Sequence, residues 1–267
     1  MNTRELEEYI TNRFRIQQEN VKYDDSFLSQ WRKIIDLKSV YSEAEILNKY
    51  IVRKFPVNFR ALEDITIEIY NSVGGEVPII TFGNSSDFED FIVNLTCKGS
   101  RPDDISQMGA SFIYGEKQKF LVLSKKYYSN TEPEYVSLSS EEWREKSMVI
   151  RREHECTHYY TKRFYGSASN NLHDELIADF VGIYEAFGYY DAKLFQHFMG
   201  IDGTGTNEGR LSLYTVGLSQ EVRNAIADIA CKCSEYLEKF SKSETCGRMN
   251  KALRINYLCE TDIKEML

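Results

Sequence analysis

The part of this chain that most constrains its fold is the segment after Ser139, because it can form one long helix. Ser139 and Glu142 have the spacing of a capping box, in which each side chain bonds a free amide group of the first helical turn. The helical pattern continues to Gly166, where the sequence GSASNN supplies a stop and a loop. The sequence therefore predicts one helix that ends close to Gly166.

This predicted helix carries the pattern H-E-x-x-H at His154, Glu155 and His158, in a chain with only four histidines. On a helix the two histidines lie one turn apart on one face, where two imidazole nitrogens can bind one metal ion at about 2.0–2.1 Å. Glu155 lies on the flank, where it can bond a water on the metal and act as a general base. Cys156 points to the far side and is a poor ligand.

The pentapeptide alone also fits a surface helix with paired histidines, so a third ligand must decide between the two interpretations. A catalytic zinc site has three protein ligands and one position for water. The metzincin pattern is excluded, because Phe164 stands in place of its third histidine and Thr161 in place of its glycine. Glu155 and His158 also form E-x-x-H, but a di-iron site needs a second copy, which the sequence lacks.

A carboxylate ligand can come from the next predicted helix, which runs from about Leu172 to Phe187 and ends at Gly188. Glu175 and Asp179 lie one turn apart on it. Exposed to water, two like charges at this spacing are mildly unfavourable, whereas facing a metal they become favourable. Glu175 is the candidate third ligand, and Asp179 the candidate acceptor for the second N–H group of a ligating histidine. The alternative is an acidic pair on a solvated helix face.

Upstream of the histidines the sequence predicts a small sheet. The segment DITIEIYNSVGGEVPIITF alternates apolar and polar residues and breaks at Gly74 and Gly75, as a β-hairpin does. A second extended pair, ASFIYG and KFLVLS, is joined by a turn from Gly115 to Lys119. Short helices precede the sheet, with a capping box at Ser42 and Glu45, and another long helix is expected from about Ser219.

The predicted fold class is thus α+β, with a small mixed or antiparallel sheet before the histidine helix and a mainly helical C-terminal portion. We expect three segments: helical residues 1–60, an α+β subdomain at 61–168 and a helical subdomain at 169–267. The glycine-rich sequence GIDGTGTNEG, residues 200–209, favours a mobile loop over a phosphate site, because no G-K-[ST] follows it.

Composition excludes several classes of protein. The chain has 33 basic and 41 acidic residues, interspersed, so a nucleic-acid groove is not expected. The N-terminal sequence is charged and no apolar run is long enough to cross a bilayer, so we expect a cytoplasmic protein without a membrane partner. The six cysteines are then expected to be free thiols, and the spacing of Cys231 and Cys233 does not fit a structural zinc site.

H-E-x-x-H on one helix, a short loop and E-x-x-x-D on the next resemble the gluzincin branch of the zincin metallopeptidases, over Trp143–Phe187. The resemblance implies a zincin-like fold in which KFLVLS is an edge strand that pairs with an extended peptide. It also implies site roles: Zn²⁺ bound by His154, His158 and Glu175, Glu155 as general base, and Asp179 as support for a ligating histidine. Asp174 stands where many members have asparagine, so Asp174 is a rival ligand.

We therefore expect a zinc-dependent hydrolase, a metallopeptidase acting on a peptide or protein substrate, with Glu155 as general base on a zinc-bound water. The alternatives are a zincin-like protein whose metal serves structure or binding without turnover, and a helical protein with no metal. No motif identifies a proton donor or oxyanion stabiliser. The candidates for that role are His173, Tyr190, His197, Arg210 and Tyr214.

Overall fold

The structure is a computed structural model that describes the chain except residues 1–2, 16–23, 116–117, 167–170, 202 and 204–208. Contacts between Cα atoms divide the chain into two units, residues 22–155 and residues 1–21 with 156–267. The division falls inside one unbroken helix, α5 (Ser140–Tyr165). The three predicted segments, 1–60, 61–168 and 169–267, stay a prediction.

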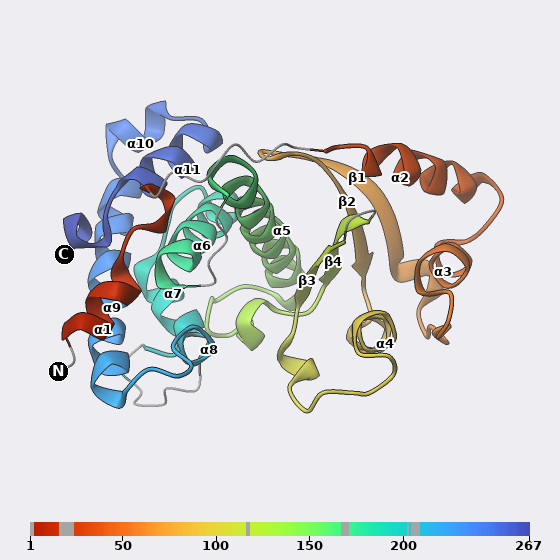
Figure 1. Cartoon of the computed structure of the whole chain (residues 1–267), viewed down its shortest axis with the longest axis horizontal. Helices are drawn as coiled ribbons and strands as arrows, with labels where there is room; N and C mark the ends of the chain where they lie inside the picture. The colour runs from red at the N-terminus through yellow and green to blue at the C-terminus, as the bar shows by residue number, and fades with distance from the viewer. Residues whose placement is uncertain (1–2, 16–23, 116–117, 167–170, 202, 204–208) are drawn as a thin grey trace. The chain divides into compact units, whose positions relative to one another are not determined.

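The first unit contains a four-stranded sheet in the order β1-β2-β4-β3 (Figure 1). Both predicted hairpins are present and antiparallel: β1 (Ile65–Ser72) with β2 (Gly75–Phe82), and β3 (Ala110–Tyr114) with β4 (Lys119–Ser124). The two hairpins are joined by parallel pairing of β2 with β4. The fold class is therefore α+β with a small mixed sheet, as predicted.

The expectation that KFLVLS is an edge strand is wrong. Strand β4 lies between β2 and β3, and the edges of the sheet are β1 and β3. The reason is visible in its burial, since Phe120 to Leu123 are all 0% exposed. A continuous apolar run of this kind is buried on both faces of a sheet, which suits an interior strand.

The two faces of the sheet have different neighbours within this unit. Phe120 and Val122 belong to a core that includes residues of α2 (Phe27–Asp36), α3 (Glu43–Ile46) and α4 (Ser85–Thr96). On the opposite face, the Tyr70 hydroxyl donates a 2.7 Å hydrogen bond to Glu153 of α5. The sheet thus separates the short N-terminal helices from the part of α5 that leads to the histidines.

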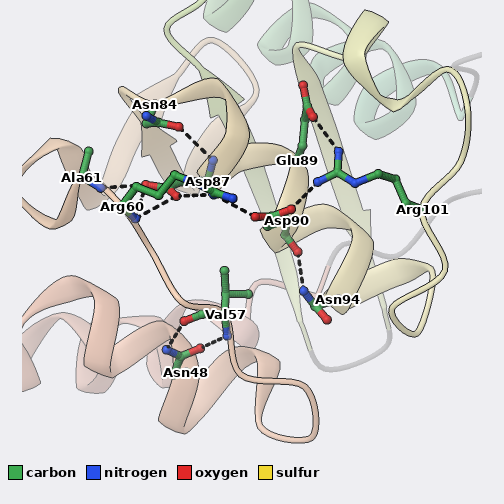
Figure 2. A network of polar contacts seen from close by, with 10 residues as sticks. All are labelled: Asn48, Val57, Arg60, Ala61, Asn84, Asp87, Glu89, Asp90, Asn94 and Arg101. Atoms are coloured by element: carbon green, nitrogen blue, oxygen red, sulfur yellow. Dashed lines mark hydrogen bonds and ion pairs between the residues drawn. The ribbon is translucent and has the colours of Figure 1, made fainter.

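A buried carboxylate fixes the start of α4 to the segment before β1 (Figure 2). Asp87 is 0% exposed and accepts hydrogen bonds from the backbone amides of Arg60 and Ala61, both at 2.9 Å. The Arg60 guanidinium bridges Asp87 at 3.1 Å and Asp90 at 2.8 Å, while Asn84 caps the helix. A buried charge is tolerated where it is paired and hydrogen-bonded in this way, so the network has a structural explanation.

The second unit is helical and includes residues 156–165 of α5. Predicted helix α6 runs from Leu172 to Phe187 and ends at Gly188, whose φ of 79° is favourable for glycine. The other helices of this unit are α1 (Thr3–Ile10), α7 (Ala192–Met199), α8 (Leu211–Tyr214), α9 (Gln220–Ser241), α10 (Glu244–Arg248) and α11 (Lys251–Glu260). The expected start of a long helix near Ser219 is thereby confirmed.

Short helical turns complete the described chain. They are η1 (Arg13–Arg15), η2 (Leu37–Ser39), the π-helix η3 (Leu47–Val52), η4 (Leu62–Asp64), η5 (Ile105–Gln107), η6 (Tyr128–Asn130) and η7 (Ile263–Met266). The predicted loops at 166–171 and 200–209 fall largely outside the described residues, as does part of the turn from Gly115 to Lys119.

Two expectations from composition can be compared with the structure. All six cysteines are free thiols, as predicted. Over the residues that the structure describes, no helix combines the length and the apolar character needed to cross a membrane.

Candidate metal centre

Helix α5 presents the H-E-x-x-H segment and begins at the predicted capping box. The Glu142 amide donates to the Ser139 hydroxyl at 3.3 Å, and the Ser139 amide donates to the Glu142 carboxylate at 3.0 Å. The helix then continues without a break to Tyr165, so His154 and His158 lie one turn apart on one helix. This part of the candidate site therefore follows from local sequence.

His154, His158 and Glu175 form a group that could hold a metal ion. Each offers one ligand atom, and these atoms all lie within 4.8 Å of one another. The His158 Nε2 atom is 3.4 Å from the Glu175 Oε1 atom. Zinc bonds of about 2.0–2.1 Å at tetrahedral angles place two ligand atoms about 3.3 Å apart. Two imidazoles and a carboxylate are also ligand types that catalytic zinc takes, so the group fits this metal.

Asp174 lies at the other edge of the His158 ring from Glu175. Its Oδ1 atom is 3.5 Å from Nδ1 of His158, and it also accepts a hydrogen bond from Thr161 at 3.4 Å. Asp174 is thus the carboxylate on the Nδ1 side of His158, the side on which sequence analysis expected Asp179. Its place at Nδ1 favours Glu175 over Asp174 as the ligand that shares a metal with Nε2.

The electrostatics of His158 reflect these two carboxylates. Burial of the ring acts to lower its pKa, but the charges and hydrogen bonds of Asp174 and Glu175 outweigh that effect, so the pKa of His158 is raised well above 6.5. The two carboxylates therefore stabilise a positive charge at His158. A divalent cation bound to the neutral ring would place a positive charge in the same surroundings.

Asp179 pairs with an arginine and does not lie on a solvated helix face. It is 0% exposed, and Nη2 of Arg210 lies 2.7 Å from its Oδ2 atom and 3.1 Å from Oε2 of Glu175. Arg210 was one of the five candidates for a proton donor or oxyanion stabiliser. A Cβ atom on the preceding Gly209 would lie 2.3 Å from the backbone nitrogen of Gly200, so only glycine allows this close approach beside Arg210.

Two tyrosines extend the cluster beyond Arg210. Nε of Arg210 donates to the Tyr214 hydroxyl at 3.3 Å, and burial raises the pKa of Tyr214 well above 10. The hydroxyl of Tyr9 donates to the backbone carbonyl of Tyr214 at 3.2 Å and accepts from the amide of Leu172, the first residue of α6, at 3.1 Å. Burial raises the pKa of Tyr9 to about 12. No motif in the sequence signals Tyr9.

The His154 ring has a partner that sequence analysis missed. The Tyr128 hydroxyl lies 3.1 Å from Nδ1 of His154, and both side chains are buried. Glu155 differs from its neighbours: it is half-buried, and its side chain forms no hydrogen bond or ion pair with any residue in the described part of the chain. A carboxylate free of such partners can accept a proton from a water, which suits the predicted general base.

Comparison with known proteins gives a family but no activity. Residues 116–267, more than half of the chain, match a sequence profile described as a family of unknown function, DUF7005. The chain belongs to this family. No curated protein and no solved structure matches it. The DUF7005 region contains the three potential ligands together with Glu155 and Arg210, whereas Tyr9 lies outside the region.

Two other candidates for the proton donor or oxyanion stabiliser, His173 and Tyr190, have contacts with core residues. Nε2 of His173 donates to the Leu258 carbonyl at 3.1 Å, and its ring meets Phe14 edge-on with centroids 5.2 Å apart. Tyr190 is 0% exposed and its ring centroid is 5.3 Å from that of Phe180. Among the five candidates, Arg210 contacts both carboxylates of α6, and Tyr214 contacts Arg210.

Proposed function

We propose that the chain is a zinc-dependent hydrolase with a zincin-like active site, and that it acts as a metallopeptidase on peptide or protein substrates. The observation that carries this proposal is the His154, His158 and Glu175 group, whose ligand atoms lie within 4.8 Å of one another. Glu155, the residue after the first histidine, supplies a carboxylate on the same helix that has no partner among the residues the structure describes. Both features match the requirements of metal-assisted hydrolysis.

In this proposal each residue has a defined task. His154, His158 and Glu175 hold the zinc, and Asp174 fixes the ring of His158 through Nδ1. Bound zinc would supply a Lewis acid that lowers the pKa of a coordinated water towards about 7 and polarises the substrate carbonyl.

Glu155 carries the proton in the hydrolytic step. It takes a proton from the attacking water as the water oxygen forms a bond to the carbonyl carbon. It then delivers that proton to the nitrogen that leaves as the C–N bond breaks. Water and amide are consumed, and a carboxylic acid and an amine are produced.

The test separates metal binding from hydrolysis. Protein purified without added zinc is assayed for metal content and for cleavage of a fluorogenic peptide library, as wild type and as Glu155→Gln. We expect about one zinc per chain in both proteins. Hydrolysis by the variant should fall at least about 100-fold, because general-base catalysis typically contributes 10²- to 10⁴-fold.

Glu145→Gln is the matched control, since Glu145 is an exposed residue of the same helix and lies outside the cluster. This variant should keep both zinc and activity. Equal hydrolysis by wild type and Glu155→Gln would contradict the assigned base. Stoichiometric zinc without cleavage of any library peptide would favour a binding or structural metal site, and protein that takes up no zinc would exclude both.

A further inference from the structure

The segment that follows β4, residues 124–131, is held by a stripe of side chains on α5. Trp143, Ser147 and Arg151 are spaced four residues apart, so they lie along one face of the helix. Trp143 and Ser147 are 0% exposed and Arg151 is 3% exposed. Three buried polar groups on one helical stripe need partners, and residues 124–131 supply them.

Trp143 and Ser147 hold the second half of this segment. The indole Nε1 of Trp143 donates to the Thr131 carbonyl at 2.7 Å. The Ser147 hydroxyl accepts from the backbone amide of Tyr128 at 3.0 Å. The backbone of Tyr128 is therefore fixed directly to α5, two turns before His154.

Arg151 holds the first half. Its Nη1 atom donates to the carbonyls of Ser124 at 2.6 Å and Lys126 at 2.9 Å, and its Nη2 atom donates to the carbonyl of Tyr127 at 3.2 Å. A Cβ atom on Gly109 would lie 2.7 Å from Nε of Arg151, so the glycine leaves room for the guanidinium. One side chain thus binds three backbone carbonyls within the four residues immediately before Tyr128.

The segment then turns sharply, and the Tyr128 side chain lies between Arg151 and His154 of α5. Ser129 and Asn130 have φ values of 49° and 53°, in the left-handed region that non-glycine residues seldom adopt. The Tyr128 ring lies 5.5 Å from the Arg151 guanidinium, and its hydroxyl lies 3.1 Å from Nδ1 of His154. Tyr128 is 5% exposed, so its hydroxyl is held within the structure and away from bulk water.

We propose that Tyr128 is a positioning residue that holds the proton of His154 on Nδ1 and so presents Nε2 to the metal. The inference rests on the proposed metal site, and it assigns Tyr128 the role that a carboxylate or a backbone carbonyl usually has beside a ligating histidine. The anchoring of residues 124–131 explains how a neutral hydroxyl can hold the His154 proton. The backbone of Tyr128 is bonded to Ser147, and the face of its ring packs against Arg151.

The experiment compares Tyr128→Phe with Tyr127→Phe. The first variant removes only the hydroxyl that contacts His154. Tyr127 is half-buried, and its hydroxyl forms no hydrogen bond with a residue that the structure describes, so the second variant is a matched control. Zinc dissociation constants are measured by competition with a chelator. Loss of a partner of this kind typically weakens metal binding about 10- to 100-fold, which we expect for Tyr128→Phe and not for Tyr127→Phe.

A second readout uses metal-free protein, in which ring ¹⁵N NMR reports the tautomer of His154. We expect the proton on Nδ1 in wild type and a shift towards the Nε2 tautomer in Tyr128→Phe. An unchanged tautomer, or equal zinc affinities of the two variants, would overturn the role of Tyr128. If the tautomer shifts but wild type takes up no zinc, the contact is supported and the proposed zinc function fails, so the two failures are distinguishable.

Discussion

Arg210 forms ion pairs with two buried carboxylates of α6, Glu175 and Asp179. Its Nη2 atom contacts both Glu175 and Asp179, whose side chains are 2% and 0% exposed. Arg210→Met removes the partner and leaves the carboxylates in place, which for buried ion pairs costs on the order of 3 kcal/mol. We predict a loss of this size in the free energy of unfolding of metal-free protein, measured by urea denaturation, and partial recovery when zinc is added.

Two variants control this prediction. Arg210→Lys keeps the charge but lacks the planar fork that reaches two carboxylates, so its loss should be smaller than that of Arg210→Met. Arg248→Met removes an arginine from a surface pair with Glu244, whose side chains are 81% and 86% exposed, and should change stability little. An Arg210→Met protein as stable as wild type would contradict a structural role for this ion pair.

Helix α6 is the element that brings the carboxylates to the site, and its first turn depends on one cap. The Asn171 side chain accepts a hydrogen bond from the Asp174 amide at 3.2 Å, immediately before Glu175. Asn171→Ala should lower the free energy of unfolding by about 1 kcal/mol, as is typical for loss of a cap. Because the frayed turn carries Asp174 and Glu175, zinc binding measured by chelator competition should weaken as well.

Asn250 is the control for Asn171, because it caps another helix in the same way. It caps α11 through a 2.9 Å hydrogen bond from the Leu253 amide, and it lies outside the cluster. Asn250→Ala should lose a similar amount of stability and keep the zinc affinity of wild type. If both variants bind zinc as wild type does, the start of α6 does not control the geometry of Glu175.

The elements were predictable wherever a local signal sets them. Helix α5 follows from its capping box, α6 from its stop at Gly188, the first hairpin from alternation with a turn, and the second from two extended segments joined by a turn. The interior position of β4 was missed, because parallel pairing of β2 with β4 joins segments about forty residues apart, and no motif in either strand identifies its partner. The fully apolar run from Phe120 to Leu123 was the available signal, since an edge strand of a small sheet seldom has it.

The residues of the candidate site also divide into those that local sequence spacing identifies and those that depend on tertiary packing. Spacing along single helices identified His154, Glu155, His158 and Glu175 as candidates. It could not distribute roles between Asp174 and Asp179, because that depends on which edge of the His158 ring faces α6. Tyr128 contacts a residue 26 positions later and Arg210 a residue 31 positions earlier, so side-chain packing brings them there and no sequence spacing reveals it.

At the scale of the whole molecule, the residues around the proposed zinc come from widely separated parts of the chain: Tyr128, the helix α5 pair, the start of α6 and Arg210. A metal that binds such a set favours the folded protein, so zinc should stabilise it by mass action.

The coordination sphere of the metal tests the zinc site most directly. X-ray absorption at the zinc edge is measured on protein purified without added metal. We predict about one zinc per chain with nitrogen and oxygen neighbours at about 2.0–2.1 Å, imidazole scattering from two histidines and no sulfur at about 2.3 Å. His158→Ala should lose this signal. Protein without zinc, or zinc bound by sulfur or by four protein ligands, would contradict a catalytic site at His154, His158 and Glu175.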